Sequence, residues 1–290
     1  MNGANIDVIM NQPGRVRALR RMVETVADGV VPLVDLCRPY VDGLQHSPRD
    51  GRFLLVGNHT QVSAEGLLIP LLVRRAIGRR VRPLADRNFG RMGGLPGDLL
   101  AAAGAVVGAP ETARELMVHD EPILVFPGGG REIAKFKGEE YTLRWQGRTG
   151  FARLAVEYNY PIVPVGLVGG DDMYRSMTTR EGRWGRLSQS LSARLSGRSD
   201  MAMPLMRGIG PTLIPRPQRM YLRFGTPIDT TRPAHVAEEE WVSTVKEDTQ
   251  RSLEQILTDL QELRRSDPYR ELNPLAWRNA AMPSTDRHEV

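Results

Sequence analysis

The chain has 290 residues, 41% of them hydrophobic and 25% charged, so it is long enough to bury the core of an ordinary soluble globular protein. No apolar run approaches the roughly 20 residues that a membrane-spanning helix needs. The only cysteine, Cys37, excludes an intramolecular disulfide and is typical of a reducing compartment. The formal net charge of +5 fits an anionic partner, but no nucleic-acid-binding motif accompanies it, so nucleic acid is not expected.

The first predicted element is a helix over about residues 14–38, in which valines and leucines recur at helical spacing. Four arginines lie near its start: Arg15, Arg17, Arg20 and Arg21. Such a helix can lie on an anionic membrane surface or pack on the protein's own core, and the sequence leaves both open. A second basic run, 74–80, is either a solvated face or a contact for a phosphate-bearing ligand or an anionic bilayer.

A histidine, His59, lies between a predicted strand at 53–56 and an apolar segment at 66–73 that predicts a helix packed on a sheet. Positions six apart lie roughly 120° from each other on a regular helix, so His59 and Glu65 can touch only if residues 58–63 form a turn. A carboxylate bonded to one imidazole nitrogen would fix the tautomer and leave the other nitrogen to act as a base.

Further short strands alternate with helices along the chain, which is the pattern of an α/β protein. Strands are expected at 81–85, 105–107, 122–126, 161–168 and 220–224, and helices at about 110–119, 149–158 and 236–265. We divide the chain into an N-terminal helical segment (1–50), an α/β core (51–235), and a C-terminal helix with a loosely ordered tail (236–290).

The strand at 122–126 ends in a loop that contains three consecutive glycines. These glycines allow the backbone to approach a ligand closely and to present its N–H groups. Two charged residues follow them at the same rim of the sheet. The loop consists of Pro127, Gly128, Gly129, Gly130, Arg131 and Glu132.

Four strand-to-loop joints therefore follow one another: Asn58-His59 to Glu65, 104–106, 126–132 and 162–165. This order resembles the motif blocks of the glycerolipid acyltransferase superfamily. The third joint is similar to the Phe-Pro-Gly-Gly-x-Arg-Glu block of the branch with monoacylglycerol and diacylglycerol acyltransferases and phytyl ester synthases. The resemblance covers roughly residues 50 to 230. It implies a single-domain α/β fold with a central mixed sheet flanked by helices.

The resemblance implies an acyl-CoA-dependent O-acyltransferase that moves a fatty acyl group to the hydroxyl of a glycerolipid or other lipid alcohol. His59 would remove the hydroxyl proton and Glu65 would orient the imidazole. Gly128, Gly129 and Gly130 would offer N–H donors to the thioester oxygen, and the adjoining Arg131 and Glu132 are expected to bind substrate, with Arg131 on a phosphate. Acyl-CoA is then a co-substrate, and no cofactor is expected.

Two positions depart from the family pattern. The usual spacing His-x4-Asp would put the acid at position 64, which is Ala64, so the partner of His59 is either Glu65 or Glu132 from the neighbouring loop. The second block, 104–111, lacks the arginine that often binds phosphate in the family. Arg131 is therefore the main candidate for a phosphate contact.

Two later segments leave alternatives open. Asp171 and Asp172 follow the strand at 161–168, where helix capping is favoured over metal binding. The segment 175–218 shows no clear periodicity and is either a lid that contacts an acyl chain or a surface excursion. The histidines are scattered without ligand spacing, so no metal site is expected.

The sequence leaves two alternative functions open. One is a lysophosphatidate or glycerol-phosphate acyltransferase of phospholipid synthesis, and the other is a catalytically silent lipid-binding protein of the same fold. Peripheral contact with the cytoplasmic face of a membrane is expected. The acceptor lipid, the acyl-chain length and the oligomeric state are not predicted.

Overall fold

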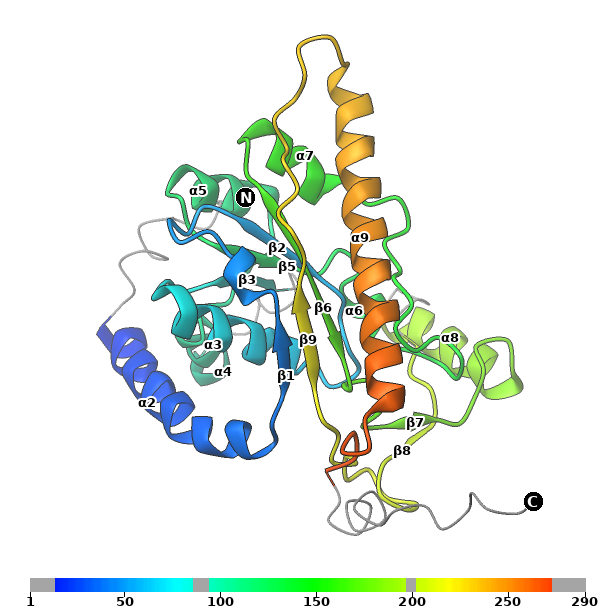
Figure 1. Ribbon diagram of the computed structural model, residues 1–290. Helices are drawn as coiled ribbons and strands as arrows, with labels where there is room; N and C mark the ends of the chain where they lie inside the picture. Colours follow the sequence, from blue (N-terminus) through cyan, green and yellow to red (C-terminus); the bar gives the residue numbers. More distant parts are fainter. Residues whose placement is uncertain (1–13, 86–93, 197–201, 273–290) are drawn as a thin grey trace, which may run out of the picture.

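The computed structural model describes residues 14–85, 94–196 and 202–272, and Figure 1 shows a central sheet between layers of helices. The helices are α2 (Gly14–Leu36), η1 (Leu44–His46), α3 (Glu65–Ile77), α4 (Gly94–Ala102), α5 (Pro110–Val118), α6 (Gly130–Ile133), α7 (Gly150–Glu157), α8 (Arg183–Ser196) and α9 (Glu238–Ser266). The strands are β1 (Tyr40–Asp42), β2 (Leu54–Gly57), β3 (Arg82–Ala85), β4 (Val106–Val107), β5 (Ile123–Val125), β6 (Ile162–Val168), β7 (Arg175–Ser176), β8 (Met206–Arg207) and β9 (Tyr221–Phe224).

The main sheet has seven strands in the order β1-β9-β6-β2-β5-β3-β4. Only the β6–β9 pair is antiparallel among its described pairings, so the expected central mixed sheet is confirmed. β2 lies between β6 and β5 and is buried along its whole length. A strand covered on both faces has no polar face, which is why residues 53–56 form a continuous apolar run.

Alternate residues of β2, together with Phe53 just before it, pack into the two halves of the core. Leu54 and Val56 belong to a cluster that also contains apolar residues of α5, α7 and α9, whereas Phe53 and Leu55 pack with residues of α3. The predicted apolar stripe of the C-terminal helix is confirmed, since these α9 residues are buried: Val242, Val245, Leu253, Ile256, Leu257 and Leu260. Gly166 in β6 allows this close packing, because a Cβ there would lie 2.5 Å from Ile256 Cγ2.

The edge strand β1 was not predicted, because residues 39–52 have the composition of a polar connection. β1 pairs in parallel with β9 from Tyr40 opposite Tyr221 to Asp42 opposite Arg223. The N-terminal segment therefore supplies one strand of the main sheet.

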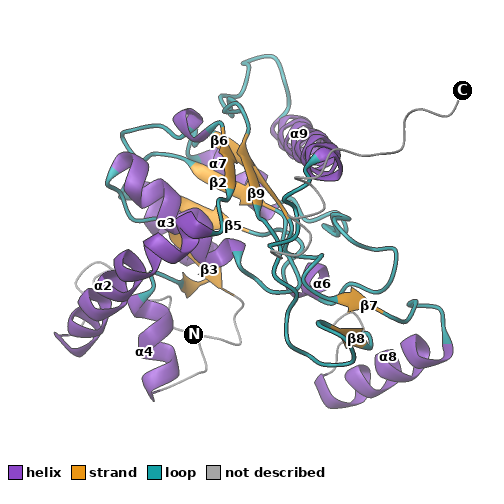
Figure 2. Ribbon diagram, turned by 60° about the horizontal axis from the view of Figure 1, so that its bottom comes forward, coloured by secondary structure: helices purple, strands orange, loops and turns teal. Residues whose placement is uncertain are grey.

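The segment 175–218, which showed no periodicity, contains a small two-stranded sheet of β7 and β8 and the helix α8. Figure 2 shows these elements to one side of the main sheet. Most of the predicted loose tail lies outside the described residues. Among the helices that are described, none combines the length and the apolar character needed to cross a membrane.

Candidate active site

His59 follows the carboxyl end of β2, and Glu65 is the first residue of α3. The chain between them forms the predicted turn, in which the Ser63 N–H donates to the Thr60 carbonyl (3.1 Å) and Ser63 has a positive φ of 53°. The turn brings Glu65 Oε1 into hydrogen-bond contact with His59 Nδ1. The structure therefore brings the predicted pair together.

The Glu65 carboxylate is fully buried and bound on both oxygens. Oε1 also accepts the Thr60 N–H (3.0 Å), and Oε2 accepts the Thr60 hydroxyl (2.6 Å). The His59 ring stacks on Phe126, with centroids 4.6 Å apart and planes inclined by 16°. Nδ1 is thus engaged and the ring plane is fixed. Among the described residues none hydrogen-bonds to Nε2, which leaves this nitrogen to exchange a proton with a ligand.

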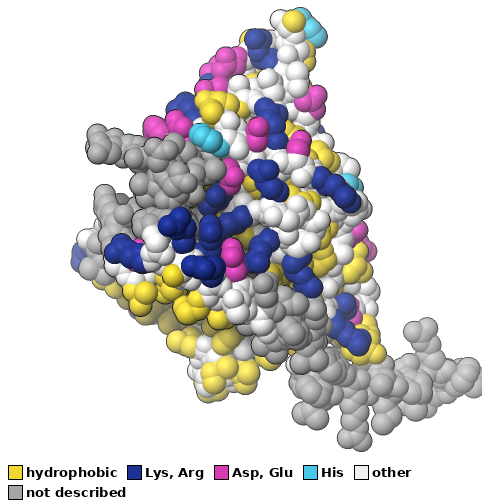
Figure 3. All heavy atoms as spheres, turned by 90° about the vertical axis from the view of Figure 1, so that its left-hand side faces the viewer, with side chains coloured by type: hydrophobic (Ala, Val, Ile, Leu, Met, Phe, Trp, Pro, Cys, Tyr) yellow, Lys and Arg dark blue, Asp and Glu magenta, His cyan; other side chains and the backbone are white. Residues whose placement is uncertain are grey.

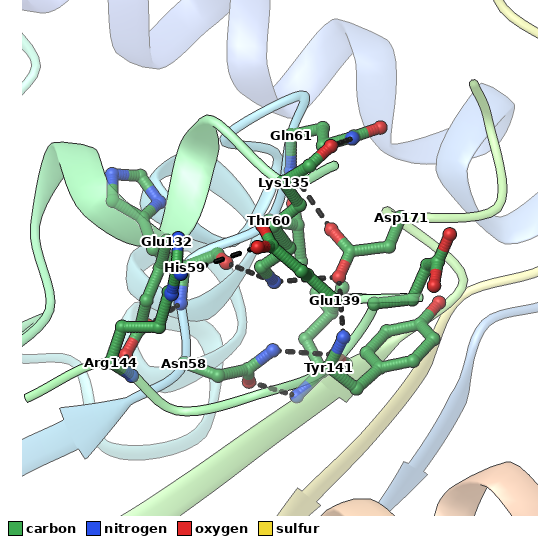
Figure 4. Close-up of polar contacts among 12 residues, drawn as sticks. Asn58, His59, Thr60, Gln61, Glu132, Lys135, Glu139, Tyr141, Arg144 and Asp171 are labelled. Carbon is green, nitrogen blue, oxygen red and sulfur yellow. Dashed lines mark hydrogen bonds and ion pairs between the residues drawn. The ribbon is translucent and has the colours of Figure 1, made fainter. Parts of the chain in front are cut away.

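Glu132 contacts the main chain of His59 rather than its ring, and its side chain is buried (Figure 4). Its carboxylate accepts the main-chain N–H of His59 (2.8 Å) and that of Arg144 (2.8 Å). Burial raises the pKa of Glu132, and the two N–H donors oppose that rise. The imidazole partner is therefore Glu65. In the structure the Glu132 carboxylate binds the main chain on both sides, and its expected contact with substrate stays a prediction.

The glycine loop is shaped by close packing around Glu132. A Cβ on Gly128 would lie 2.2 Å from Glu132 Oε1, so a larger residue there would displace the carboxylate. The Gly129 N–H closes the turn on the Phe126 carbonyl (2.9 Å) and is not available to a ligand oxygen in this conformation. The role of the Gly128 and Gly130 N–H groups as oxyanion donors stays a prediction. Arg131 is half-buried in α6.

A buried ion pair supports the other side of the His59 peptide, and it was not predicted. Lys135 Nζ donates to the His59 carbonyl (2.8 Å) and to Asp171 Oδ2 (2.6 Å), and both side chains are buried. Asp171 also accepts the N–H groups of Gln61 (3.0 Å) and Tyr141 (2.9 Å). The capping role expected for Asp171 is therefore wrong, because it lies in a turn after β6 and binds a lysine.

The neighbouring carboxylate, Asp172, accepts the hydroxyl of Tyr141 (2.5 Å), and this hydroxyl in turn accepts the Gly169 N–H (2.8 Å). Burial and the nearby aspartates raise the pKa of Tyr141 well above its usual range, so the phenol stays neutral and keeps donating. Within the part of the chain that the structure describes, no group of three or more His, Cys, Asp or Glu side chains could hold a metal ion.

Comparison with known proteins places this site in a family. A family model described as Acyltransferase matches residues 38–168, which include the His59–Glu65 pair and the glycine loop. Over 271 residues the chain is 29% identical to phytyl ester synthase 2, chloroplastic, of Arabidopsis thaliana. Residues 38–168 form an acyltransferase domain of the glycerolipid acyltransferase superfamily.

The alignment with this phytyl ester synthase covers 87% of the chain but 37% of the relative. An uncharacterised protein of Mycobacterium tuberculosis is 32% identical over 201 residues, which cover 67% of the chain and 52% of that protein. The chain therefore spans about a third to a half of the length of these two relatives. The crystal structure of the 1-acyl-sn-glycerophosphate (LPA) acyltransferase of Thermotoga maritima is similar with a TM-score of 0.46 and 17% identity, over 86% of both chains.

Proposed function

We propose that this protein is an acyl-CoA-dependent O-acyltransferase that moves a fatty acyl group to the hydroxyl of a glycerolipid or other lipid alcohol, with His59 as the general base. The observation that carries the proposal is the His59–Glu65 pair at the end of β2, beside the glycine loop. Membership of the superfamily supports acyl transfer, and the name of the phytyl ester synthase relative supports formation of an ester.

In the proposed reaction, His59 Nε2 takes the proton of the acceptor hydroxyl as its oxygen attacks the thioester carbonyl carbon. The carbon–sulfur bond then breaks, and the CoA thiolate takes the proton back from Nε2. Glu65 stabilises the imidazolium that exists between these steps, and no acyl-enzyme is required. The N–H groups of Gly128 and Gly130 are the candidates to stabilise the negative charge on the carbonyl oxygen.

The test is to incubate the protein with acyl-CoA and, separately, with lysophosphatidate, monoacylglycerol, diacylglycerol and a long-chain alcohol. Free CoA is measured together with the lipid product, which is identified by mass spectrometry. We expect an ester product and an equal amount of CoA with at least one neutral acceptor. Lipid binding without CoA release would instead support the silent lipid-binding alternative.

Replacing Glu65 by glutamine is expected to lower kcat by about 10²-fold, because the amide keeps a hydrogen-bond acceptor for Thr60 but cannot balance the charge of a protonated His59. KM for acyl-CoA should change little, since Glu65 is buried below the histidine. Glu111→Gln is the matched control, because Glu111 occupies the first turn of α5 but is exposed. Wild-type kcat in Glu65→Gln would contradict the proposed role.

Replacing Arg131 by alanine is expected to raise KM for acyl-CoA by about tenfold, because a charge-assisted hydrogen bond to a phosphate of CoA would be lost. The order of preference among acceptors should stay the same. Arg153→Ala is the control, because Arg153 forms an exposed ion pair with Glu239 on the surface. If the variant instead loses activity on lysophosphatidate alone, the lysophosphatidate acyltransferase alternative is favoured.

We also propose that the protein works while bound peripherally to the cytoplasmic face of a membrane. α2 packs against α4, and the two helices expose apolar side chains that include Met22, Val26 and Leu95. The arginines at the start of α2 add positive charge on this side, where Figure 3 shows basic side chains beside a hydrophobic area. Val16 is buried, so one face of α2 packs on the protein, and its exposed face can contact lipid.

A further inference from the structure

The helix α8 carries its apolar residues on the side that faces away from the protein. Trp184, Leu187 and Leu191 follow one another at helical spacing, and they are 39%, 60% and 54% exposed. The side that faces the protein is small or polar. Gly185 is buried with no room for a Cβ, and Gln189 Nε2 donates to the Arg180 carbonyl (2.9 Å). This is the reverse of a helix that packs on its own core.

The exposed part of α8 is also basic. Arg183, Arg186 and Arg194 are exposed, and the helix contains no acidic residue. At about 100° per residue, these arginines form a row that adjoins the apolar row on the outward side of the helix. A row of arginines beside a row that contains tryptophan and leucine is typical of helices that lie in the interface of an anionic bilayer.

The exposed apolar surface extends to the segment 203–214, which follows α8, and to Met177, which precedes α8. Met177 after β7 is exposed, and its N–H donates to the carbonyl of Leu205 (2.8 Å), which is exposed too. The other exposed apolar side chains of this segment are Met203, Ile209, Leu213 and Ile214. So many neighbouring apolar side chains exceed the single exposed residues that are normal on a soluble surface.

α8 is held rigidly to the loops of the candidate active site. The Arg180 guanidinium, just before α8, makes two hydrogen bonds to the Glu139 carboxylate (2.6 and 2.7 Å) and one to the Ala134 carbonyl (2.9 Å). Ser176 Oγ in β7 accepts from Gln61 Nε2 (3.0 Å), which belongs to the turn that carries His59. A surface bound to α8 is therefore fixed in orientation relative to His59.

Figure 2 shows α8 and the pair α2–α4 projecting on the same lower side of the view, at its two lateral edges. The helix α6, which carries Glu132, lies between them in this view. A flat surface that contacts both elements would therefore face the region of the candidate site.

We propose that α8 and the adjoining segment 203–214 bind the interface of an anionic lipid bilayer, as a second contact separate from the α2–α4 pair. The apolar row enters the acyl-chain boundary and the arginines contact the headgroup phosphates. This goes beyond the proposed function, because it concerns lipid binding by a surface that takes no part in acyl transfer.

The test is sedimentation of the full chain with vesicles of phosphatidylcholine, with and without phosphatidylglycerol. Leu187→Glu/Leu191→Glu is expected to lower the partition coefficient at least about tenfold on both kinds of vesicle, because two exposed leucines lose their burial in lipid. Arg186→Gln/Arg194→Gln should lower it about tenfold, but only on vesicles that contain phosphatidylglycerol. Val118→Glu is the matched control, since Val118 is as exposed but lies on α5.

Unchanged partition of Leu187→Glu/Leu191→Glu would overturn the proposal, as would failure of the wild-type chain to bind either kind of vesicle. A wild-type dimer that this variant converts to a monomer, measured by light scattering, would also overturn it by assigning α8 to a second copy of the chain. Acyl transfer from acyl-CoA to an acceptor dispersed in detergent should be unchanged in the variant. If the proposed function is wrong, neither the wild-type chain nor the variants will transfer acyl groups, and the difference in vesicle binding between them will remain.

Discussion

Replacing His59 by alanine is expected to lower kcat for acyl transfer by about 10²–10⁴-fold, the usual contribution of a positioned general base. The neighbouring carboxylates do not replace it, because Glu65 and Glu132 are fully buried and already accept main-chain N–H groups. The fold should survive, since the His59 side chain is 15% exposed and its loss leaves the main-chain bonds of the turn in place. The measurement is CoA release from acyl-CoA with a saturating acceptor.

His119→Ala is the matched control for this variant. His119 is exposed and its Nδ1 is hydrogen-bonded to the Glu115 carbonyl (2.8 Å). It follows α5 and precedes β5, whereas the glycine loop follows β5. Thermal unfolding followed by circular dichroism separates lost chemistry from lost structure. Full activity in His59→Ala, or an equal loss in His119→Ala, would contradict the assignment of the base.

Replacing Lys135 by methionine is expected to lower the free energy of unfolding by about 3–5 kcal/mol, the usual cost of leaving one charge of a buried pair without its partner. Methionine keeps the length of the side chain, so no large cavity forms. The lost stability then comes from the unpaired charge of Asp171 and the unbonded carbonyl of His59. Urea denaturation measures the change, with an unchanged m-value as the sign that the unfolding reaction is the same.

Two further variants sharpen this experiment. Lys137→Met, two residues later, removes a lysine that is exposed, and it should change stability by less than about 0.5 kcal/mol. The double variant Lys135→Met/Asp171→Asn removes both charges and should cost less than the sum of the two single changes. Strict additivity would show that the two side chains do not stabilise each other.

The parts of the site that were predicted from the sequence are those with a local signal. The apolar run before His59 predicts β2, and the six-residue spacing to Glu65 requires the turn that the structure contains. The glycine loop is predicted because three consecutive glycines directly follow a buried strand. They allow backbone conformations that an ordinary turn does not require. The long helix α9 is predicted by its apolar stripe, since helical periodicity is the strongest signal in a single sequence.

The parts that were missed depend on contacts between distant segments. A fully buried lysine is rare unless it is paired, and the partner of Lys135 lies 36 residues away after a different strand. Glu132 is a candidate partner of the imidazole in the sequence, but no local pattern indicates that it accepts main-chain N–H groups 12 and 73 residues away. The strand β1 was missed because three residues are too few to show a period.

The pairing of β1 with β9 limits how far the chain can be shortened at its N-terminal side. The first 50 residues contain both α2 and β1, and β1 covers the outer edge of β9. Asp42 adds an ion pair to Arg223 (2.9 Å), and Arg223 also contacts Asp259 of α9 (3.0 Å). Deleting the first 50 residues to obtain a more soluble enzyme would uncover a row of unpaired strand groups and invite aggregation. The proposed membrane contact is therefore better tested by surface substitutions than by shortening the chain.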